Sequence, residues 1–188
     1  MNTKENQRVR LTKRLLRESL IKLLEKQTIY DITVSQLCED AEINRSTFYK
    51  YYNNIREIYE EIEQEALSAG ASCIASVNVH DKESIIHQVE GLLSHIMKNS
   101  ELYTLLMENS ADGEFPYKLI EGTVGRIADM HELMPVSMRS YAEYCSLFVV
   151  SGSLSIIRKW LSSGMNESPH ELAELILNIA TGKIGFRI

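Results

Sequence analysis

The sequence predicts an all-α protein with a small three-helix domain at its N-terminus and a larger helical domain after it. Apolar residues recur at helical spacing along the 188 residues, and no segment shows a convincing strand alternation. Helix-capping residues precede several of these segments. Residues 1–56 contain 11 Lys and Arg against 7 Asp and Glu, although the whole chain has a net charge of −6. This change of sign places the domain boundary between residues 54 and 55.

The first predicted helix covers residues 7–26. One apolar stripe on it consists of Leu16, Leu20, Leu23 and Leu24. Other positions carry a basic cluster of Arg8, Arg10, Lys13, Arg14 and Arg17. Two interpretations of this cluster stay open: it reaches the minor groove or backbone of a nucleic acid, or it is a solvated face.

Two short helices joined by a turn are predicted between Thr33 and Tyr52. Thr33 and Gln36 have capping-box spacing, which begins the first of them. Its apolar face consists of Val34, Leu37, Cys38 and Ala41. After a turn of about three residues, Asn44 is a suitable N-cap for a second helix that begins at Arg45.

The second short helix has an outward face suited to the major groove of DNA. Its periodicity turns Phe48 and Tyr52 inward. The outward and flanking positions carry cations and hydroxyls but no carboxylate: Arg45, Ser46, Thr47, Tyr49, Lys50 and Tyr51. Such donors reach base edges and phosphates. The alternative is an ordinary helical hairpin with a polar face.

This stretch resembles the recognition segment of the tetracycline-repressor-type (TetR) regulators. The resemblance covers roughly residues 8–60 and is carried by residues 41–52, Asn54, Ile58 and Tyr59. It implies a one-component regulator whose usual action is repression of a promoter. Two departures matter, because the family usually has glycine where this chain has Glu42 and often lysine where it has Ile55. We expect a slightly different turn at Glu42, since glycine tolerates positive φ better.

We therefore expect residues 1–54 to be a helix-turn-helix DNA-binding domain for a double-stranded operator. Arg56 is expected to contact phosphate in place of the lysine that the family often has at the position of Ile55. The full set of expected DNA contacts is Thr33, Arg45, Ser46, Thr47, Tyr49, Lys50, Tyr51 and Arg56.

Residues 55–188 are predicted to form an effector-sensing and dimerisation domain made of helices. The first expected helix runs from Asn54 to about Val77 and has a solvated acidic face at 57–65. Helices at 81–98 and 100–109, a loop at 110–113, a helix at 116–131 and a break at Pro135 follow. The last two expected helices are a long one at 137–163, which Gly164 ends, and one that Ser168 caps.

The last two helices are expected to pair with a second copy of the chain. Residues 137–163 are apolar nearly all round, and the last helix has a seam of Leu172, Leu175, Ile176 and Ile179. A chain of this size has few other elements to cover both, which favours a homodimeric four-helix bundle. The alternative is that they fill the core of one monomer.

A small-molecule effector is the other expected partner. Methionine and tyrosine suit a pocket for an uncharged or weakly polar molecule, and the candidates are Tyr103, Met107, Tyr141, Tyr144, Cys145 and Phe148. The alternative is that these residues are ordinary core.

Motifs of enzymes and metal sites are missing from the sequence, so we expect no catalytic residues, no metal and no cofactor. Three distant cysteines and the lack of a long apolar run indicate a soluble, cytoplasmic protein that does not enter the membrane. Two competing functions stay open: a helix-turn-helix activator controlled by a partner protein, and an all-α scaffold that does not bind DNA.

Overall fold

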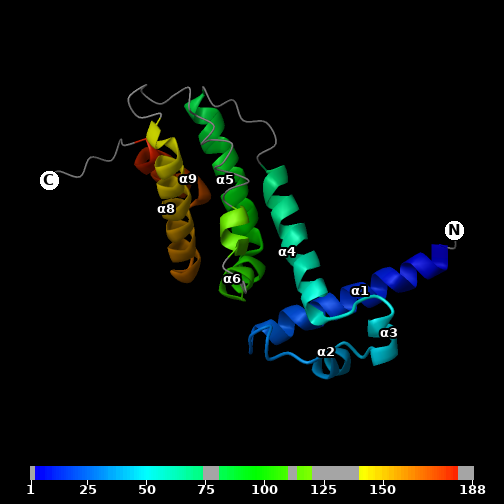
Figure 1. Cartoon of the computed structure of the whole chain (residues 1–188). Helices are drawn as coiled ribbons and strands as arrows, with labels where there is room; N and C mark the ends of the chain where they lie inside the picture. The colour runs from blue at the N-terminus through cyan, green and yellow to red at the C-terminus, as the bar shows by residue number, and fades with distance from the viewer. Residues whose placement is uncertain (1–2, 74–80, 110–113, 120–139, 182–188) are drawn as a thin grey trace. The chain divides into compact units, whose positions relative to one another are not determined.

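The computed structural model describes residues 3–73, 81–109, 114–119 and 140–181 (Figure 1). Every regular element in these ranges is helical, as predicted. The chain divides into two compact units, Met1–Ala66 and Leu67–Ile188. The sequence placed the boundary at 54/55, whereas the first turns of the fourth helix belong to the N-terminal unit. No helix among the described residues is long and apolar enough to cross a membrane.

The N-terminal unit is built from α1 (Thr3–Leu24), α2 (Val34–Asp40), α3 (Arg45–Tyr49) and the first turns of α4 (Ile55–Ser72). The apolar faces of all four helices supply its core. Its fully buried side chains include Leu16, Leu20, Leu37, Phe48, Ile58 and Ile62. α1 begins and ends a few residues earlier than expected, and α4 ends at Ser72. Val77, its expected end, lies outside the described residues.

Ion pairs connect α1 to α4 within this unit. Lys13 Nζ lies 2.8 Å from Glu61 Oε1, and Arg17 pairs with Glu65. Tyr52, which is 3% exposed, donates its hydroxyl hydrogen to Glu61 Oε2 at 2.7 Å. The sequence suggested that the acidic face of α4 is simply solvated. In the structure, Glu61 and Glu65 on this face pair with α1 instead. Three members of the basic cluster on α1, Lys13, Arg14 and Arg17, likewise have carboxylate partners inside the protein.

The charge on Glu61 is stabilised by these neighbours. Burial alone raises the pKa of Glu61, but hydrogen bonds from Lys13 and Tyr52 and the charges of Lys13 and Arg17 outweigh it and hold the pKa below its ordinary value. Burial and the bond to Glu61 raise the pKa of Tyr52. Glu61 thus remains a carboxylate that positions both α1 and the end of the helix-turn-helix.

The C-terminal unit contains α5 (Lys82–Lys98), α6 (Ser100–Asn109), a helical segment at 114–119, α8 (Ala142–Ser162) and α9 (Pro169–Ala180). α5 packs extensively on α9, while α8 packs on both α6 and α9 (Figure 1). The largest fully buried side chains here are Trp160, Tyr103, Phe115, Leu93 and Ile96.

The bounds of α5, α6 and α9 agree with the sequence prediction. Asp81 caps α5, and Ser168 with Glu171 forms the predicted capping box of α9. α8 begins at Ala142 instead of residue 137, after a 3₁₀ turn at 140–141. The predicted loop at 110–113, most of the helix at 116–131 and the break at Pro135 lie outside the described residues.

Candidate DNA-binding surface

The turn between α2 and α3 has the left-handed backbone that glycine favours, although its residue is Glu42. Glu42 has φ 55°. Its N–H donates to the carbonyl of Glu39 at 3.2 Å, and the N–H of Ile43 donates to the carbonyl of Cys38 at 2.9 Å. These two bonds define a Schellman C-cap. The expectation of a different turn was wrong, because the backbone bonds that end α2 hold the glutamate in the strained conformation.

α3 begins as predicted, with Asn44 as its N-cap. Asn44 Oδ1 accepts from the N–H of Ser46 at 3.0 Å. Phe48 is completely buried and Tyr52 nearly so, which confirms the predicted inward face. The rings of Phe48 and Tyr49 meet edge to face with centroids 5.2 Å apart. This anchor determines which side of the short helix faces solvent.

The outward side chains of α3 are placed as the sequence predicted. Arg45, Ser46, Tyr49 and Lys50 are exposed, and Tyr49 is 58% exposed. Thr47 and Tyr51 are half-buried beside them. α3 and the residues directly after it therefore bring six of the eight predicted contacts together.

The remaining two predicted contacts lie at the beginnings of other helices. Thr33 is exposed as the N-cap of α2, where its hydroxyl accepts from the N–H of Gln36. Arg56 is exposed in the first turn of α4, but its Nε lies 3.0 Å from Glu60 Oε1. Arg56 therefore already has a carboxylate partner within α4, with which any anion would have to compete.

The cations of α3 and of its C-cap, Arg45 and Lys50, are available to a ligand. Among the residues that the structure describes, neither Arg45 nor Lys50 forms an ion pair, and the ammonium of Lys50 lies 5.6 Å from the ring centroid of Tyr51. Burial raises the pKa of the Cys38 thiol, while the charge of Arg45 opposes that shift. Cys38 is therefore an unreactive core residue behind a positively charged face.

The six predicted effector residues are not gathered into one pocket. Tyr103 and Met107 are buried on α6. In contrast, Tyr141, Tyr144 and Phe148 are 55%, 72% and 68% exposed at and after the start of α8, and Cys145 is half-buried. The reason is the orientation of α8, which turns Leu154, Ile157 and Trp160 inward and the predicted aromatic face outward.

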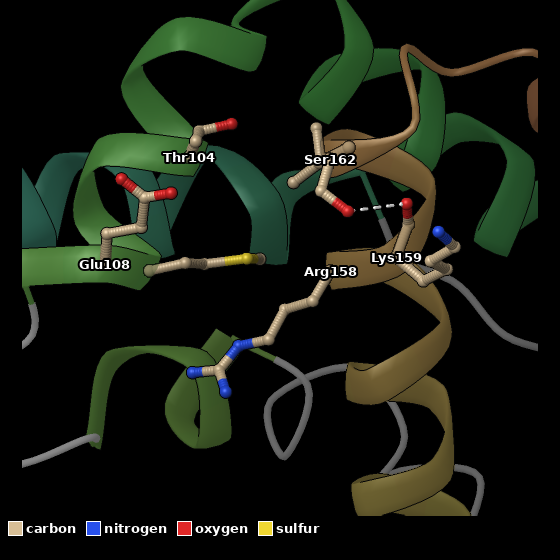
Figure 2. Close-up of a pocket in the computed structure, with 7 residues that line it drawn as sticks. Thr104, Glu108, Arg158, Lys159 and Ser162 are labelled. Carbon is tan, nitrogen blue, oxygen red and sulfur yellow. Dashed lines mark hydrogen bonds between the residues drawn. The ribbon is translucent and has the colours of Figure 1, made fainter.

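A surface cleft of about 380 Å³ does lie between α6 and α8 (Figure 2). α6 contributes Thr104, Met107 and Glu108, and α8 contributes Arg158, Lys159, Leu161 and Ser162. Met107 is the predicted effector residue that lines it. Sequence reasoning missed the charged members, because exposed Arg and Lys on an apolar helix have no periodic signal. Among the described residues, no group of three His, Cys, Asp or Glu side chains could hold a metal ion.

Known proteins resemble this chain over most of its length. One relative is an HTH-type transcriptional regulator, YxbF, of Bacillus subtilis (strain 168), which is 22% identical over 176 residues. The match covers 89% of this chain and 44% of that protein, so the chain spans less than half of the relative's length.

Solved structures share the fold. A TetR transcriptional regulator from Streptococcus agalactiae 2603V superposes with a TM-score of 0.72 at 20% identity, covering 94% of this chain and 97% of the other. The dihydroxyacetone kinase operon activator DhaS superposes with a TM-score of 0.60 at 17% identity, covering 92% and 96%.

The family is established by the C-terminal unit. A model of the C-terminal region of TetR-type transcriptional regulators matches residues 83–182, which is more than half of the chain. The N-terminal unit has the helix-turn-helix that such regulators place on DNA. The chain therefore belongs to the TetR family of DNA-binding transcriptional regulators.

Proposed function

We propose that this protein is a repressor that occupies an inverted-repeat operator as a homodimer and is released by a small-molecule effector. The observation that carries the DNA-binding part is the outward face of α3. It presents Arg45 and Lys50 without carboxylate partners among the described residues, on a helix that buried Phe48 and Tyr52 hold in place. Phosphates and base edges of DNA accept hydrogen bonds from cationic side chains and hydroxyls of this kind.

Exposed apolar side chains on α8 support the homodimer. Tyr144, Leu147 and Phe148 are 72%, 59% and 68% exposed, and Leu175 on α9 is 39% exposed. Large apolar side chains exposed to this degree favour burial against another surface. A second copy offers the same patch, and a two-fold axis would make the operator an inverted repeat with half-site centres roughly 34–36 Å apart or a multiple of this.

The structure changes which residue should test the dimer. Ile176, which the sequence placed on an outward seam, is only 8% exposed and packs within the monomer. Phe148→Ser removes an exposed ring instead. We expect this variant to sediment as a folded monomer and to bind the operator poorly, whereas a wild-type monomer at micromolar concentration would exclude the proposed dimer.

Gel shifts with genomic fragments over a range of salt test the DNA interface. Lys50→Ala should weaken all DNA about equally and lower the salt slope by about one. Arg45→Ala or Thr47→Ala should cost roughly 1–3 kcal/mol, mainly on the specific site. Lys82→Ala, which removes an exposed cation in the C-terminal unit, is the matched control. Unchanged operator binding in all three α3 variants would contradict the assignment.

An activator is the second candidate, because DhaS, whose fold this chain shares, is named as an operon activator. A reporter driven by the bound promoter separates the two actions. Deleting the gene should raise expression if the protein represses and lower it if the protein activates. A response that needs a second protein instead of a small molecule would favour control by a partner.

A further inference from the structure

The cleft between α6 and α8 has the size and the lining of a ligand site. Its volume of about 380 Å³ lies in the range of small-molecule pockets. Its apolar surface comes from Met107, which is 7% exposed, and from half-buried Leu161. A methionine side chain is flexible and polarizable, so it can adapt to hydrocarbon groups of different shape.

Arg158 is the polar feature that a ligand would meet. Its side chain is exposed and forms no ion pair within the described part of the chain, although Glu108 lines the same cleft. Figure 2 shows Arg158 extending from α8 toward the side of α6, while the Glu108 carboxylate lies near Thr104. A guanidinium that does not pair with an available carboxylate is free to bind an anion through two parallel hydrogen bonds.

The charge of the cleft restricts the ligand class. Arg158 and Lys159 are positive and Glu108 is negative, so the lining has a net charge of +1 at neutral pH. This balance suits one negative charge and disfavours a doubly charged phosphate, which would leave a charge uncompensated beside Glu108.

The backbone that positions Arg158 is held firmly. Trp160, which is 2% exposed, donates its indole N–H to the carbonyl of Glu167 at 2.9 Å. A second Schellman C-cap ends α8, where the N–H of Met165 donates to the carbonyl of Trp160 at 2.9 Å. The turn that carries Arg158 is thus anchored on both its buried face and its C-terminal side.

We infer that the α6–α8 cleft binds an organic monocarboxylate with a short hydrocarbon body. Arg158 holds the carboxylate, and the hydrocarbon lies on Met107 and Leu161. The binding step involves the C-terminal unit alone, while its meaning as the release signal depends on the proposed function. Occupation would favour whichever conformational state spaces α6 and α8 to fit the ligand.

Isothermal titration of the full-length protein with octanoate tests this site, with octan-1-ol as the uncharged analogue of equal length and octyl phosphate as the doubly charged one. We expect octanoate to bind more tightly than both. Arg158→Gln should weaken octanoate binding about tenfold or more, and Arg158→Lys less, because lysine loses the bidentate geometry. Glu108→Gln should tighten it and should reduce the discrimination against octyl phosphate.

Lys82→Gln is the control, since it removes an exposed cation of the same unit outside the cleft. Far-UV circular dichroism and Trp160 fluorescence establish that each variant folds. The inference is overturned if Arg158→Gln binds octanoate like wild type, if octan-1-ol binds as tightly, or if no heat appears up to about 5 mM octanoate.

Gel shifts of wild type and Arg158→Gln without octanoate separate this inference from the proposed function. Intact DNA binding without octanoate binding would remove only the cleft assignment. Octanoate binding that depends on Arg158, in a protein that shifts no DNA, would leave the cleft assigned and remove the proposed regulator.

Discussion

Replacing Glu42 by glycine should stabilise the N-terminal unit. Glu42 is a non-glycine residue at φ 55°, in the C′ position of the Schellman cap that ends α2. A left-handed backbone costs an L-residue about 1–2 kcal/mol. Glycine removes this cost but has more freedom in the unfolded chain, which takes back about 0.4–1 kcal/mol. The net expectation for Glu42→Gly is therefore a gain of about 0.5–1 kcal/mol in the free energy of unfolding.

The C-terminal unit contains the reciprocal experiment. Gly164 occupies the same position in the Schellman cap of α8, at φ 88°, and an added Cβ there would meet nothing within 4 Å. Gly164→Ala should therefore lose about 1 kcal/mol through the backbone alone. The two substitutions isolate one physical cause, since each changes the residue in a left-handed cap and leaves the cap hydrogen bonds in place.

Urea unfolding measures both effects. Circular dichroism at 222 nm follows both units, and fluorescence of Trp160, the single tryptophan, follows the C-terminal unit. Glu42→Ala is the matched control, because it removes the carboxylate but keeps a side chain at positive φ. The reasoning is refuted if Glu42→Gly unfolds at the wild-type urea concentration, or if Glu42→Ala stabilises as much as Glu42→Gly, which would make charge the cause.

Three further predictions concern the packing. Phe48→Ala should destabilise the N-terminal unit by about 3–5 kcal/mol and abolish operator binding in gel shifts, while the Trp160 signal of the C-terminal unit stays native. In a double-mutant cycle, Lys13→Gln and Glu61→Gln should show a coupling of about 0.2–1 kcal/mol in urea unfolding; additive losses would mean that this pair contributes nothing. The third prediction concerns pH. The hydrogen bond to Glu90, 3.0 Å away, raises the pKa of His170 in the folded protein. This pair therefore stabilises the C-terminal unit fully at pH values below the pKa of about 6.5 that histidine has in the unfolded chain, and the stabilisation is lost as the pH rises through the folded pKa of His170. Glu90→Gln should remove that part of the pH dependence, as seen by thermal melts between about pH 5 and 8.

The sequence was most informative where a signal is local. A capping bond joins residues two or three apart, so Thr33, Asn44 and Ser168 identified the beginnings of α2, α3 and α9. The inward face of α3 was also predictable, because Phe48 on the helix and Tyr52 just after it lie on one side and carry large rings. The candidate DNA surface follows from these local facts, since whatever is not turned inward on so short a helix faces solvent.

The α1–α4 ion pairs show a signal that was present but not used. Lys13 and Arg17 are four residues apart on α1, and their partners Glu61 and Glu65 are four apart on α4. Equal spacing on two helices is what a ladder of pairs requires, because residues four apart lie on the same helix face. The sequence alone, however, does not say that these two faces meet.

α8 shows why the predicted effector pocket could not be placed from the sequence. Periodicity identifies the buried face of a helix only when the opposite face is polar, and this helix is apolar nearly all round. Tyr144 and Leu154 were therefore equally good candidates for the interior, yet Tyr144 is 72% exposed and Leu154 is 4% exposed. The residues that break the apolar pattern carry the information instead. Arg158 and Lys159 mark the part of α8 that borders a cleft, whereas the exposed side chains of Tyr144, Leu147 and Phe148 mark the part that we propose to pair with a second copy of the chain. Substituting Arg158 and Phe148 separately should therefore affect different properties, ligand binding in one case and association in the other.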